Sequence, residues 1–195
     1  MKPVVIVGAG PAGLAVAAML SARRIPYVMV DASGEPGGAY RTVYTRMTLV
    51  SPSEMNALPG LRLTSRGRYT TAAEMRDYLA RYASHHGLVI DRAEVGKVTR
   101  ALDVTTDHGV IDARAVVVAS GMWRFPIIPA ELPASAIHAS AYAGPTPERT
   151  LIIGGGASGV EIAEDIANAG ATVWLSVRRS IRPVPAYALA RRMLW

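Results

Sequence analysis

The start of the chain alternates short β-branched runs with a segment rich in alanine and leucine. Residues 2–7 form a β-branched run that predicts a strand, residues 14–23 predict a helix, and residues 27–30 predict a second strand. Pro26 separates the helix from the second strand. This order predicts a βαβ unit with two parallel strands and a right-handed crossover.

A long irregular segment precedes the second predicted helix. Residues 32–70 are rich in glycine, proline and serine, and a loop of this length usually contacts a ligand. Residues 71–86 predict a helix that Thr70 or Thr71 caps. Gly87 ends this helix. Its apolar residues recur at helical spacing and form one stripe: Met75, Tyr78, Leu79 and Tyr82.

Short strands follow this helix. Residues 88–90 predict a third parallel strand, and residues 94–118 predict a meander of short strands with a turn at residues 107–109. Residues 116–119 predict a buried strand that runs into a Ser-Gly pair.

A second copy of the opening pattern follows a proline-rich linker at residues 122–148. Residues 151–159 restate residues 5–13 position by position. The pattern continues with a helix at residues 160–169 and a strand at residues 172–177. The sequence therefore predicts an α/β fold with two Rossmann-type dinucleotide-binding units, of which the first carries the β-meander.

Composition limits the chemistry of the chain. It contains no cysteine, which excludes a disulfide, a thiolate metal site and a redox-active dithiol of its own, and we expect no metal. Its net charge of +6 comes from 21 basic and 15 acidic residues. No basic run is interleaved with aromatic residues, so a nucleic-acid partner is not expected, whereas nucleotide phosphates explain part of the charge.

The N-terminal residues 2–20 superficially resemble a secretory signal. Gly8, Gly10 and Gly13 interrupt the apolar run at the positions that a phosphate-binding turn requires, so we reject that interpretation. No apolar run is long enough to span a membrane. We expect a soluble, cytoplasmic protein that acts on a small molecule.

The first unit carries a glycine motif between its strand and its helix. Gly8 permits a tight turn, Gly10 lets a pyrophosphate approach the backbone, and Gly13 allows close packing of helix on strand. The helix N-terminus supplies amide donors and the positive end of the helix dipole. Asp31 lies eighteen residues after Gly13, where a carboxylate can accept hydrogen bonds from both hydroxyls of an adenosine ribose.

The second motif differs at the position of the acid. The residue eighteen positions after Gly159 is Val177, and it is followed by Arg178 and Arg179. Two arginines at the end of this strand suit the 2′-phosphate of NADP, which predicts a preference for NADPH over NADH. The alternative is that both arginines are simply solvated.

The motifs occur in a specific order along the chain. They are Gly8-x-Gly10-x-x-Gly13, Gly37-Gly38-Ala39-Tyr40-Arg41, Ala119-Ser120-Gly121, His138-x-x-x-Tyr142 and Gly154-x-Gly156-x-Ser158-Gly159. This order resembles the N-terminal half of the flavin-containing monooxygenases, and the likeness covers nearly the whole chain. Two dinucleotides on one chain also imply hydride transfer from a nicotinamide to a flavin.

The resemblance implies a function and a domain organisation. In that family the first fold binds FAD, the second binds NADPH, and the reduced flavin reacts with O2 to give a C4a-hydroperoxide that bound NADP protects. It implies an NADPH- and FAD-dependent monooxygenase of a nucleophilic nitrogen or sulfur compound or of a ketone. It further implies an FAD-binding domain at residues 1–122, a linker at 123–148 and a partial NADPH-binding domain at 149–195.

The resemblance also assigns cofactor-binding residues, although it identifies no catalytic residue. For FAD these are Gly8, Gly10, Pro11, Ala12, Gly13, Asp31, Ala32, Gly38, Ala39, Tyr40, Arg41 and, through its backbone near the adenine, Val95. Between the two domains they are Ala119, Ser120 and Gly121. For NADPH they are Gly154, Gly156, Ala157, Ser158, Gly159, Arg178 and Arg179. Plain packing is the alternative for Tyr40, Arg41 and Val95.

The sequence departs from the family pattern at two motifs. Leu132 and Ala134 stand where the fingerprint around His138 has phenylalanine and glycine. Some members also place an asparagine beside the flavin just before a Pro-Lys pair, where this chain has residues 50–53, Val-Ser-Pro-Ser. Whether the protein transfers oxygen or only releases peroxide is therefore left open.

The chain ends earlier than its relatives, which supply further strands and a cover for the flavin ring. We therefore expect a truncated or split enzyme that a second chain or a homo-oligomer completes. Two alternatives remain. One is a flavoprotein similar to the pyridine nucleotide-disulfide reductases that lacks their dithiol, and the other is a nucleotide-binding fragment without oxygenase activity.

Overall fold

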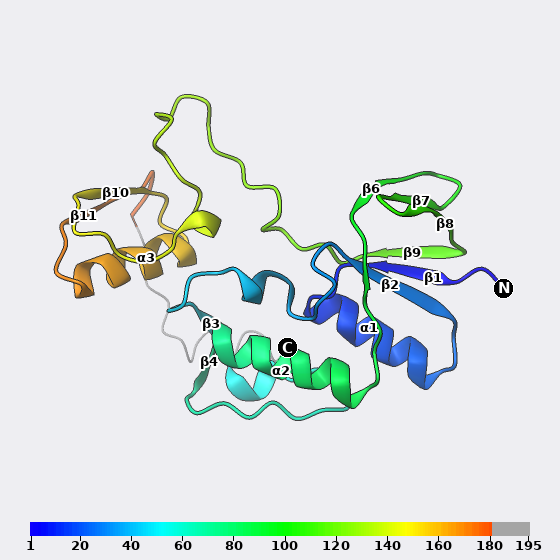
Figure 1. The fold of residues 1–195 in the computed structure, drawn as a ribbon. Helices are drawn as coiled ribbons and strands as arrows, with labels where there is room; N and C mark the ends of the chain where they lie inside the picture. Colours follow the sequence, from blue (N-terminus) through cyan, green and yellow to red (C-terminus); the bar gives the residue numbers. More distant parts are fainter. Residues whose placement is uncertain (181–195) are drawn as a thin grey trace. The chain divides into compact units, whose positions relative to one another are not determined.

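The computed structural model describes residues 1–180, and Figure 1 labels most of their helices and strands. Close backbone contacts divide the chain into two compact units, which we describe separately. The first unit contains residues 1–41, 57–63 and 73–124. The second unit contains residues 42–56, 64–72 and 125–180.

A parallel sheet of four strands forms the centre of the first unit. Its strands, in spatial order, are β5 (Asp91–Arg92), β2 (Tyr27–Asp31), β1 (Val4–Val7) and β9 (Ala115–Val118). Helix α1 (Pro11–Ala22) connects β1 to β2, so the predicted βαβ unit is confirmed. The helix begins three residues before the predicted start, because Gly10 takes the N-cap position and proline suits the first helical position.

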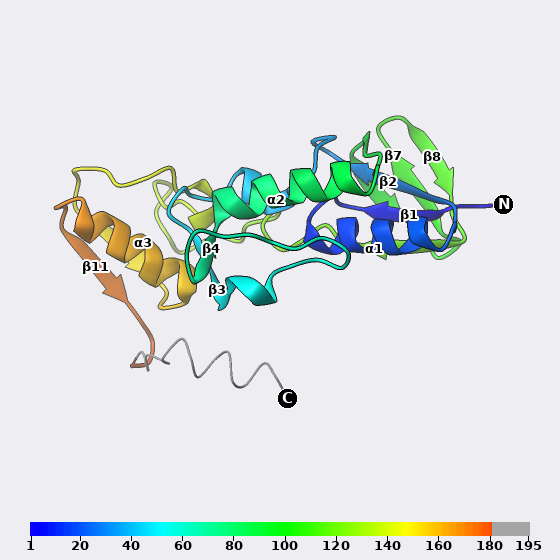
Figure 2. The same ribbon diagram turned by 90° about the horizontal axis from the view of Figure 1, so that it is seen from below.

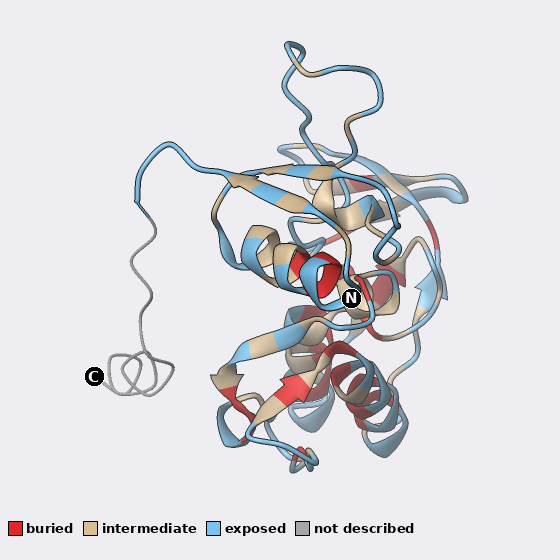
Figure 3. Ribbon diagram, turned by 90° about the vertical axis from the view of Figure 1, so that its left-hand side faces the viewer, coloured by how far each residue is buried: buried red, intermediate tan, exposed pale blue. Residues whose placement is uncertain are grey.

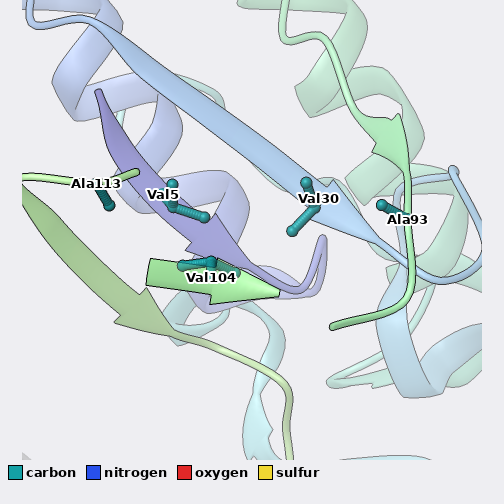
Figure 4. Packing of buried hydrophobic residues seen from close by; sticks show 5 residues of the cluster. All are labelled: Val5, Val30, Ala93, Val104 and Ala113. Atoms are coloured by element: carbon teal, nitrogen blue, oxygen red, sulfur yellow. The ribbon is translucent and has the colours of Figure 1, made fainter. Parts of the chain in front are cut away.

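The two faces of this sheet are covered by different elements. On one face lies α1, whose Leu14 and Ala17 are fully buried, and Figure 2 shows the helix beside β1. The antiparallel meander that covers the other face consists of β6 (Val95–Val98), β7 (Asp103–Thr106) and β8 (Gly109–Asp112). Sheet and meander share a core, drawn in Figure 4, that comprises Val5, Val30, Ala93, Val104 and Ala113. The predicted meander is confirmed.

Helix α2 (Ala72–His85) buries its predicted apolar stripe. The four residues Met75, Tyr78, Leu79 and Tyr82 are each at most 3% exposed. The Tyr82 hydroxyl donates to the Pro59 carbonyl at 2.8 Å, so the helix also holds the segment of residues 57–63. The helix ends, as predicted, before Gly87.

Two strands of the first unit differ from the prediction. The predicted strand at residues 88–90 is wrong, because the chain pairs with the end of β2 only at Asp91–Arg92. The prediction of a buried strand at residues 116–119 is also wrong in its burial. Strand β9 lies at the edge of the sheet and leaves Val118 70% exposed.

The second unit contains another βαβ arrangement. Strands β10 (Thr150–Ile153) and β11 (Val173–Ser176) are parallel, and helix α3 (Ala157–Asn168) connects them, which confirms the predicted repeat. The helix begins before the predicted residue 160 because Gly156 takes the N-cap position. Exposed and half-buried residues alternate along both strands, as Figure 3 shows.

The segment at residues 32–70 is more ordered than the predicted loop. It contains the short helices η1 (Gly38–Arg41) and η2 (Ser53–Met55) and the strand β3 (Thr48–Pro52), and it reaches β4 (Tyr69–Thr71). Strands β3 and β4 pair in antiparallel fashion. The Asn56 amide joins the two sides, because its Nδ2 donates to the Ser51 carbonyl at 3.2 Å and to the Thr70 hydroxyl at 3.4 Å.

The predicted linker is largely irregular but includes the short helix η3 (Ala139–Ala141). Within residues 1–180, no helix has the length and apolar character needed to cross a membrane. The same part of the chain contains no group of three His, Asp or Glu side chains arranged to hold a metal ion.

Candidate functional site

The first glycine turn lies at the carboxyl end of β1. Gly8 has a φ of +107°, and a Cβ atom at this position would overlap the Ala119 carbonyl oxygen. A Cβ atom at Gly13 would overlap the carbonyl oxygen of Gly8 itself. Only glycine therefore lets the first turn of α1 pack directly on the end of the strand.

Gly10, unlike Gly8 and Gly13, has space for a Cβ atom. It takes the N-cap position of α1 with extended backbone angles, and the nearest atom to an added Cβ would be Gly38 Cα at 3.9 Å. Pro11 and Ala12 follow it in the first turn, and Ala12 is exposed. The space over this turn is thus open at the helix N-terminus, where backbone amides favour an anion.

Asp31 ends β2 beside this turn. Its Oδ2 accepts a hydrogen bond from the Ala9 amide at 2.9 Å, which ties the carboxylate to the glycine turn. Its Oδ1 accepts from the Ser33 amide at 2.8 Å and the Ser33 hydroxyl at 2.6 Å. A carboxylate offers about four acceptor positions, so Asp31 retains capacity for a further donor such as a ribose hydroxyl. Ala32 follows it and is half-buried.

Helix η1 brings the second predicted motif to the same turn. The Gly37 amide donates to the Ala9 carbonyl at 2.9 Å, and Gly38 lies against the Cα of Gly10. Ala39 and Tyr40 follow in η1, and burial raises the pKa of the Tyr40 hydroxyl.

Arg41 ends η1 with one of its guanidinium nitrogens unsatisfied. Its Nη2 forms an ion pair with Glu35 at 2.5 Å. Its Nη1 is buried and has no hydrogen-bond partner among the residues that the structure describes. A buried cationic donor without an acceptor fits an anionic ligand such as a phosphate.

The segment after β9 also reaches the first turn. The Ala119 amide donates to the Val7 carbonyl at 2.8 Å, and the Ser120 amide lies beside Gly8. Gly121 follows with a φ of +74°. Val95 differs from these residues, since its side chain packs against the core of sheet and meander.

The second glycine turn repeats the geometry of the first. Gly154 has a φ of +116°, and a Cβ atom at Gly159 would overlap the Gly154 carbonyl oxygen. The N-cap Gly156 has φ −77° and ψ 178°, compared with −79° and −174° for Gly10. A Cβ at Gly156 would meet no atom within 4 Å, so this turn is open as well.

The two arginines follow β11 at the same edge of the second sheet. The Gly154 amide donates to the Ser176 carbonyl at 2.9 Å, which places the end of β11 beside the glycine turn. Arg178 and Arg179 come two and three residues later, and both are exposed. Ala157 and Ser158, also predicted to bind the dinucleotide, form the first turn of α3.

The structure reveals a polar cluster in the second unit that sequence reasoning missed. The Tyr44 hydroxyl donates to Glu161 of α3 at 2.5 Å, and the Tyr142 hydroxyl donates to Asp165 at 2.9 Å. The two tyrosine rings meet edge to face, with centroids 5.9 Å apart. Arg46 Nε lies 3.2 Å from the second oxygen of the buried Asp165.

The environment of this cluster raises the pKa of both tyrosine hydroxyls. Burial, and after it the hydrogen bond to a carboxylate, raises the pKa of Tyr44 and of Tyr142 to about 12. One sequence signal could have indicated the cluster. Glu161 and Asp165 are one turn apart on α3, and acids at this spacing share a helix face.

The predicted fingerprint around His138 lies in this unit. His138 Nδ1 accepts a hydrogen bond from the Ser140 amide at 3.2 Å, so the imidazole caps η3. The fingerprint tyrosine is Tyr142, which contacts α3 through Asp165.

Comparison with known proteins identifies the family. A family model described as pyridine nucleotide-disulphide oxidoreductase matches residues 5–190. The chain belongs to this family. Because the chain contains no cysteine, membership of the family does not bring a dithiol of its own.

Two curated relatives illustrate the similarity. An uncharacterized CzcO-like oxidoreductase from Geobacillus kaustophilus is 29% identical over 98% of this chain and 59% of its own length. The indole-3-pyruvate monooxygenase YUCCA1 of Oryza sativa subsp. japonica is 31% identical over 93% of this chain and 49% of its own length. The chain therefore spans about half to three fifths of the length of these relatives.

Solved structures agree with the predicted fold. A variant of the flavin monooxygenase from Stenotrophomonas maltophilia is 30% identical with a TM-score of 0.86, over 98% of this chain and 64% of that one. A flavin-containing monooxygenase from the same organism is 27% identical with a TM-score of 0.78, and the match covers 99% of this chain and 68% of that one. The predicted resemblance to flavin-containing monooxygenases is thereby confirmed, as is the α/β fold class.

Proposed function

We propose that this chain binds FAD at its first glycine turn and NADPH at its second, as part of a flavin-dependent monooxygenase. One observation carries the proposal. The same open, helix-capping glycine turn occurs twice, at Gly10 and at Gly156, with backbone angles that agree closely. Each turn presents a helix N-terminus to a pyrophosphate, which is the group that both dinucleotides share.

The residues around the first turn fit FAD. Asp31 is fixed by Ala9 and Ser33 and keeps acceptor capacity for the adenosine ribose. The unpartnered Nη1 of Arg41 would be satisfied by a phosphate oxygen. Gly38 and the Ala119-Ser120-Gly121 segment, which lie against the same turn, would border the cofactor.

The residues around the second turn fit NADPH. Gly154, Gly156 and Gly159 would admit its pyrophosphate, with Ala157 and Ser158 in the first turn of the helix. The exposed Arg178 and Arg179 would bind the 2′-phosphate, which NADH lacks. In functional terms, residues 1–122 would thus serve FAD and residues 149–195 NADPH, with residues 123–148 between them.

The proposed reaction balances as NADPH, H+, O2 and substrate giving NADP+, water and an oxygenated substrate. A flavin, when bound, supplies the hydride acceptor and the means of reducing O2. The substrate would be a nucleophilic nitrogen or sulfur compound or a ketone. The contribution of the described residues is to bind and orient the two cofactors.

The absorbance spectrum of the purified chain with added FAD tests the proposal. We expect flavin bands that stay with the protein through gel filtration and that bleach on anaerobic addition of NADPH, but more slowly with NADH. A chain that retains no flavin would overturn the FAD assignment, and retained flavin that NADPH does not reduce would overturn the NADPH assignment.

Product analysis in air then tests the oxygenase part. Oxygenated product in proportion to NADPH consumed supports a monooxygenase. Conversion of nearly all consumed NADPH into hydrogen peroxide supports an oxidase instead, which the Val-Ser-Pro-Ser sequence at residues 50–53 would favour.

A further inference from the structure

The helix behind the second glycine turn has a polar face of which the cofactor assignment uses only Ser158. Ser158, Glu161 and Asp165 follow one another at helical spacing on α3, beginning in its first turn. The adjacent side of the helix is apolar, since Ile162 and Ile166 are buried. The polar face therefore extends from the phosphate-binding turn to the partners of Glu161 and Asp165, which are Tyr44 and Tyr142.

Tyr44 is the partner of Glu161. Its side chain is only 6% exposed, and its hydroxyl donates to the Glu161 carboxylate at 2.5 Å. The Ser158 side chain also hydrogen-bonds to this hydroxyl, and this bond opposes the rise of the Tyr44 pKa. One tyrosine oxygen thus contacts both a helix carboxylate and a residue of the glycine motif.

The neighbouring pair lacks this connection. The Tyr142 hydroxyl donates to Asp165, which lies one turn further from the glycine motif and has Arg46 as a second partner. Asp165 therefore keeps a compensating cation when Tyr142 loses its hydroxyl. Glu161 has no ion pair among those found in residues 1–180 and depends on Tyr44 for its strong hydrogen bond.

We infer that Tyr44 is a positioning residue for the second dinucleotide, because its hydroxyl holds the Glu161 carboxylate and so keeps it from opposing the phosphates at the first turn of α3. The inference rests on the proposed NADPH site. Tyr44 itself touches no cofactor in this scheme and acts through Glu161 and Ser158.

The physical reason is electrostatic. A carboxylate one helical turn from a pyrophosphate repels it, and the repulsion is larger at a partly buried site than in water. A hydroxyl that donates to the carboxylate lowers its effective negative charge and fixes its direction. Without that donor the carboxylate would turn to the next available hydroxyl, that of Ser158, and bring its charge to the phosphate site.

Direct binding of NADPH to the FAD-loaded chain tests the inference. The variants are Tyr44→Phe, Glu161→Gln and the double variant, with Tyr142→Phe as the matched control for removal of a tyrosine hydroxyl from the same cluster. Isothermal titration gives the dissociation constant of NADPH. Flavin content and a circular dichroism melt report whether each variant is folded.

Removing the Tyr44 hydroxyl should weaken NADPH binding about three- to tenfold, since one partly screened charge is released near the phosphates. Flavin content should stay unchanged. Tyr142→Phe should change the dissociation constant less than about twofold. In the Glu161→Gln background the same loss of the Tyr44 hydroxyl should also change it less than about twofold, because the charge is already gone.

The outcomes separate the inference from the proposed function. A wild-type chain that does not bind NADPH refutes the proposed function itself. A wild-type chain that binds NADPH, with a Tyr44→Phe effect that persists in the Glu161→Gln background, refutes only the positioning role. If Tyr44→Phe fails to fold, Glu161→Gln alone still tests the inference. NADPH binding that is weakened more than about threefold in this variant would show that Glu161 binds NADPH, and it would refute the positioning role of Tyr44.

Discussion

Replacing Gly10 and Gly13 by alanine, one at a time, should separate two properties of the first glycine turn. Gly13→Ala tests the packing of helix on strand, because the new methyl group would overlap the Gly8 carbonyl oxygen. Gly10→Ala tests the approach of a phosphate, because the new methyl group would meet only Gly38 Cα, at 3.9 Å. The backbone angles of Gly10 suit any L-residue, so strain does not distinguish the variants.

The expected magnitudes follow from these contacts. Overpacking against backbone costs about 1–3 kcal/mol or more, and alanine returns up to about 1 kcal/mol through its better helix propensity. We expect Gly13→Ala to lower the free energy of unfolding by about 2 kcal/mol. Gly10→Ala should change it by less than about 1 kcal/mol, the usual range for N-cap substitutions.

Affinity for FAD should instead be affected more by Gly10→Ala than by Gly13→Ala. A methyl group at Gly10 would displace the pyrophosphate from the amide donors, and loss of one charge-assisted hydrogen bond of about 1.5–3 kcal/mol corresponds to roughly ten- to hundredfold weaker binding. Gly13→Ala should weaken FAD binding only as far as it unfolds the unit.

Urea unfolding without FAD, followed by circular dichroism, gives the stabilities, and quenching of flavin fluorescence gives the affinities. Gly96→Ala is the matched control, since a Cβ there meets nothing within 4 Å and no positive φ is involved. Equal destabilisation by Gly10→Ala and Gly13→Ala, or a Gly13→Ala protein as stable as the Gly96→Ala control, would refute this division of roles.

Three other substitutions follow from the same geometry. Asp31→Asn should weaken FAD binding about tenfold, because Ala9 and Ser33 already use three of about four acceptor positions of the carboxylate and the single oxygen of the amide leaves none for a ribose hydroxyl, and fluorescence titration would reveal this. Arg178→Ala should reduce the preference for NADPH over NADH at least about fivefold, as measured by titration with each nucleotide; equal loss for both would contradict a 2′-phosphate contact. Tyr44→Phe should reduce the loss of unfolding free energy that the protein shows at alkaline pH. Because folding raises the Tyr44 pKa from its ordinary value of 10.0 to about 12, the folded state retains a proton that the unfolded state releases, so stability falls as the pH rises through this range. The wild-type chain should therefore lose up to about 3 kcal/mol more than the Phe variant between pH 10 and pH 12 in urea unfolding, and equal losses would contradict the burial of this hydroxyl.

The elements that the sequence predicts well are those specified by local patterns. The βαβ units at both ends of the described chain and the meander carry their own periodicity, turns and glycines, so each could be located without its neighbours. The strand predicted at residues 88–90 fails for the opposite reason. Its apolar residues suit a strand, but the partner strand β2 determines where pairing occurs, and that information is not local.

The pairing of β3 with β4 could not be predicted for a related reason. The two strands are separated by residues 53–68, and Asn56 holds them together through hydrogen bonds to Ser51 and Thr70. A sequence rich in glycine, proline and serine gives no sign of such a contact. Side-chain bonds across a segment appear only once the chain has folded.

The residues of the candidate sites also divide into those that local sequence patterns predict and those that depend on contacts between distant parts of the chain. The glycine turns and Asp31 follow from spacing alone, because each needs a particular backbone shape at a fixed distance along the chain. The pair of Tyr44 and Glu161 joins residues 117 positions apart, and no spacing predicts it. The unsatisfied Nη1 of Arg41 is likewise a property of its surroundings.

The two repeats also show which parts of the proposed dinucleotide sites depend on their surroundings. Val5 of the first repeat is fully buried beneath the meander, whereas Leu151, at the equivalent position of the second, is 60% exposed. Nevertheless, the two glycine turns have nearly the same backbone angles, so the turn follows from its own glycines and from helix packing on the strand, whether or not the sheet is covered.

What differs between the repeats lies at the end of the second strand. Eighteen residues after the last glycine, the first repeat has Asp31 and the second has Val177 followed by Arg178. A carboxylate favours ribose hydroxyls and repels a 2′-phosphate, whereas a guanidinium does the reverse. In the proposed assignment the shared turn serves the pyrophosphate and the end of the second strand selects the ribose, so one βαβ design would hold two different dinucleotides on one chain.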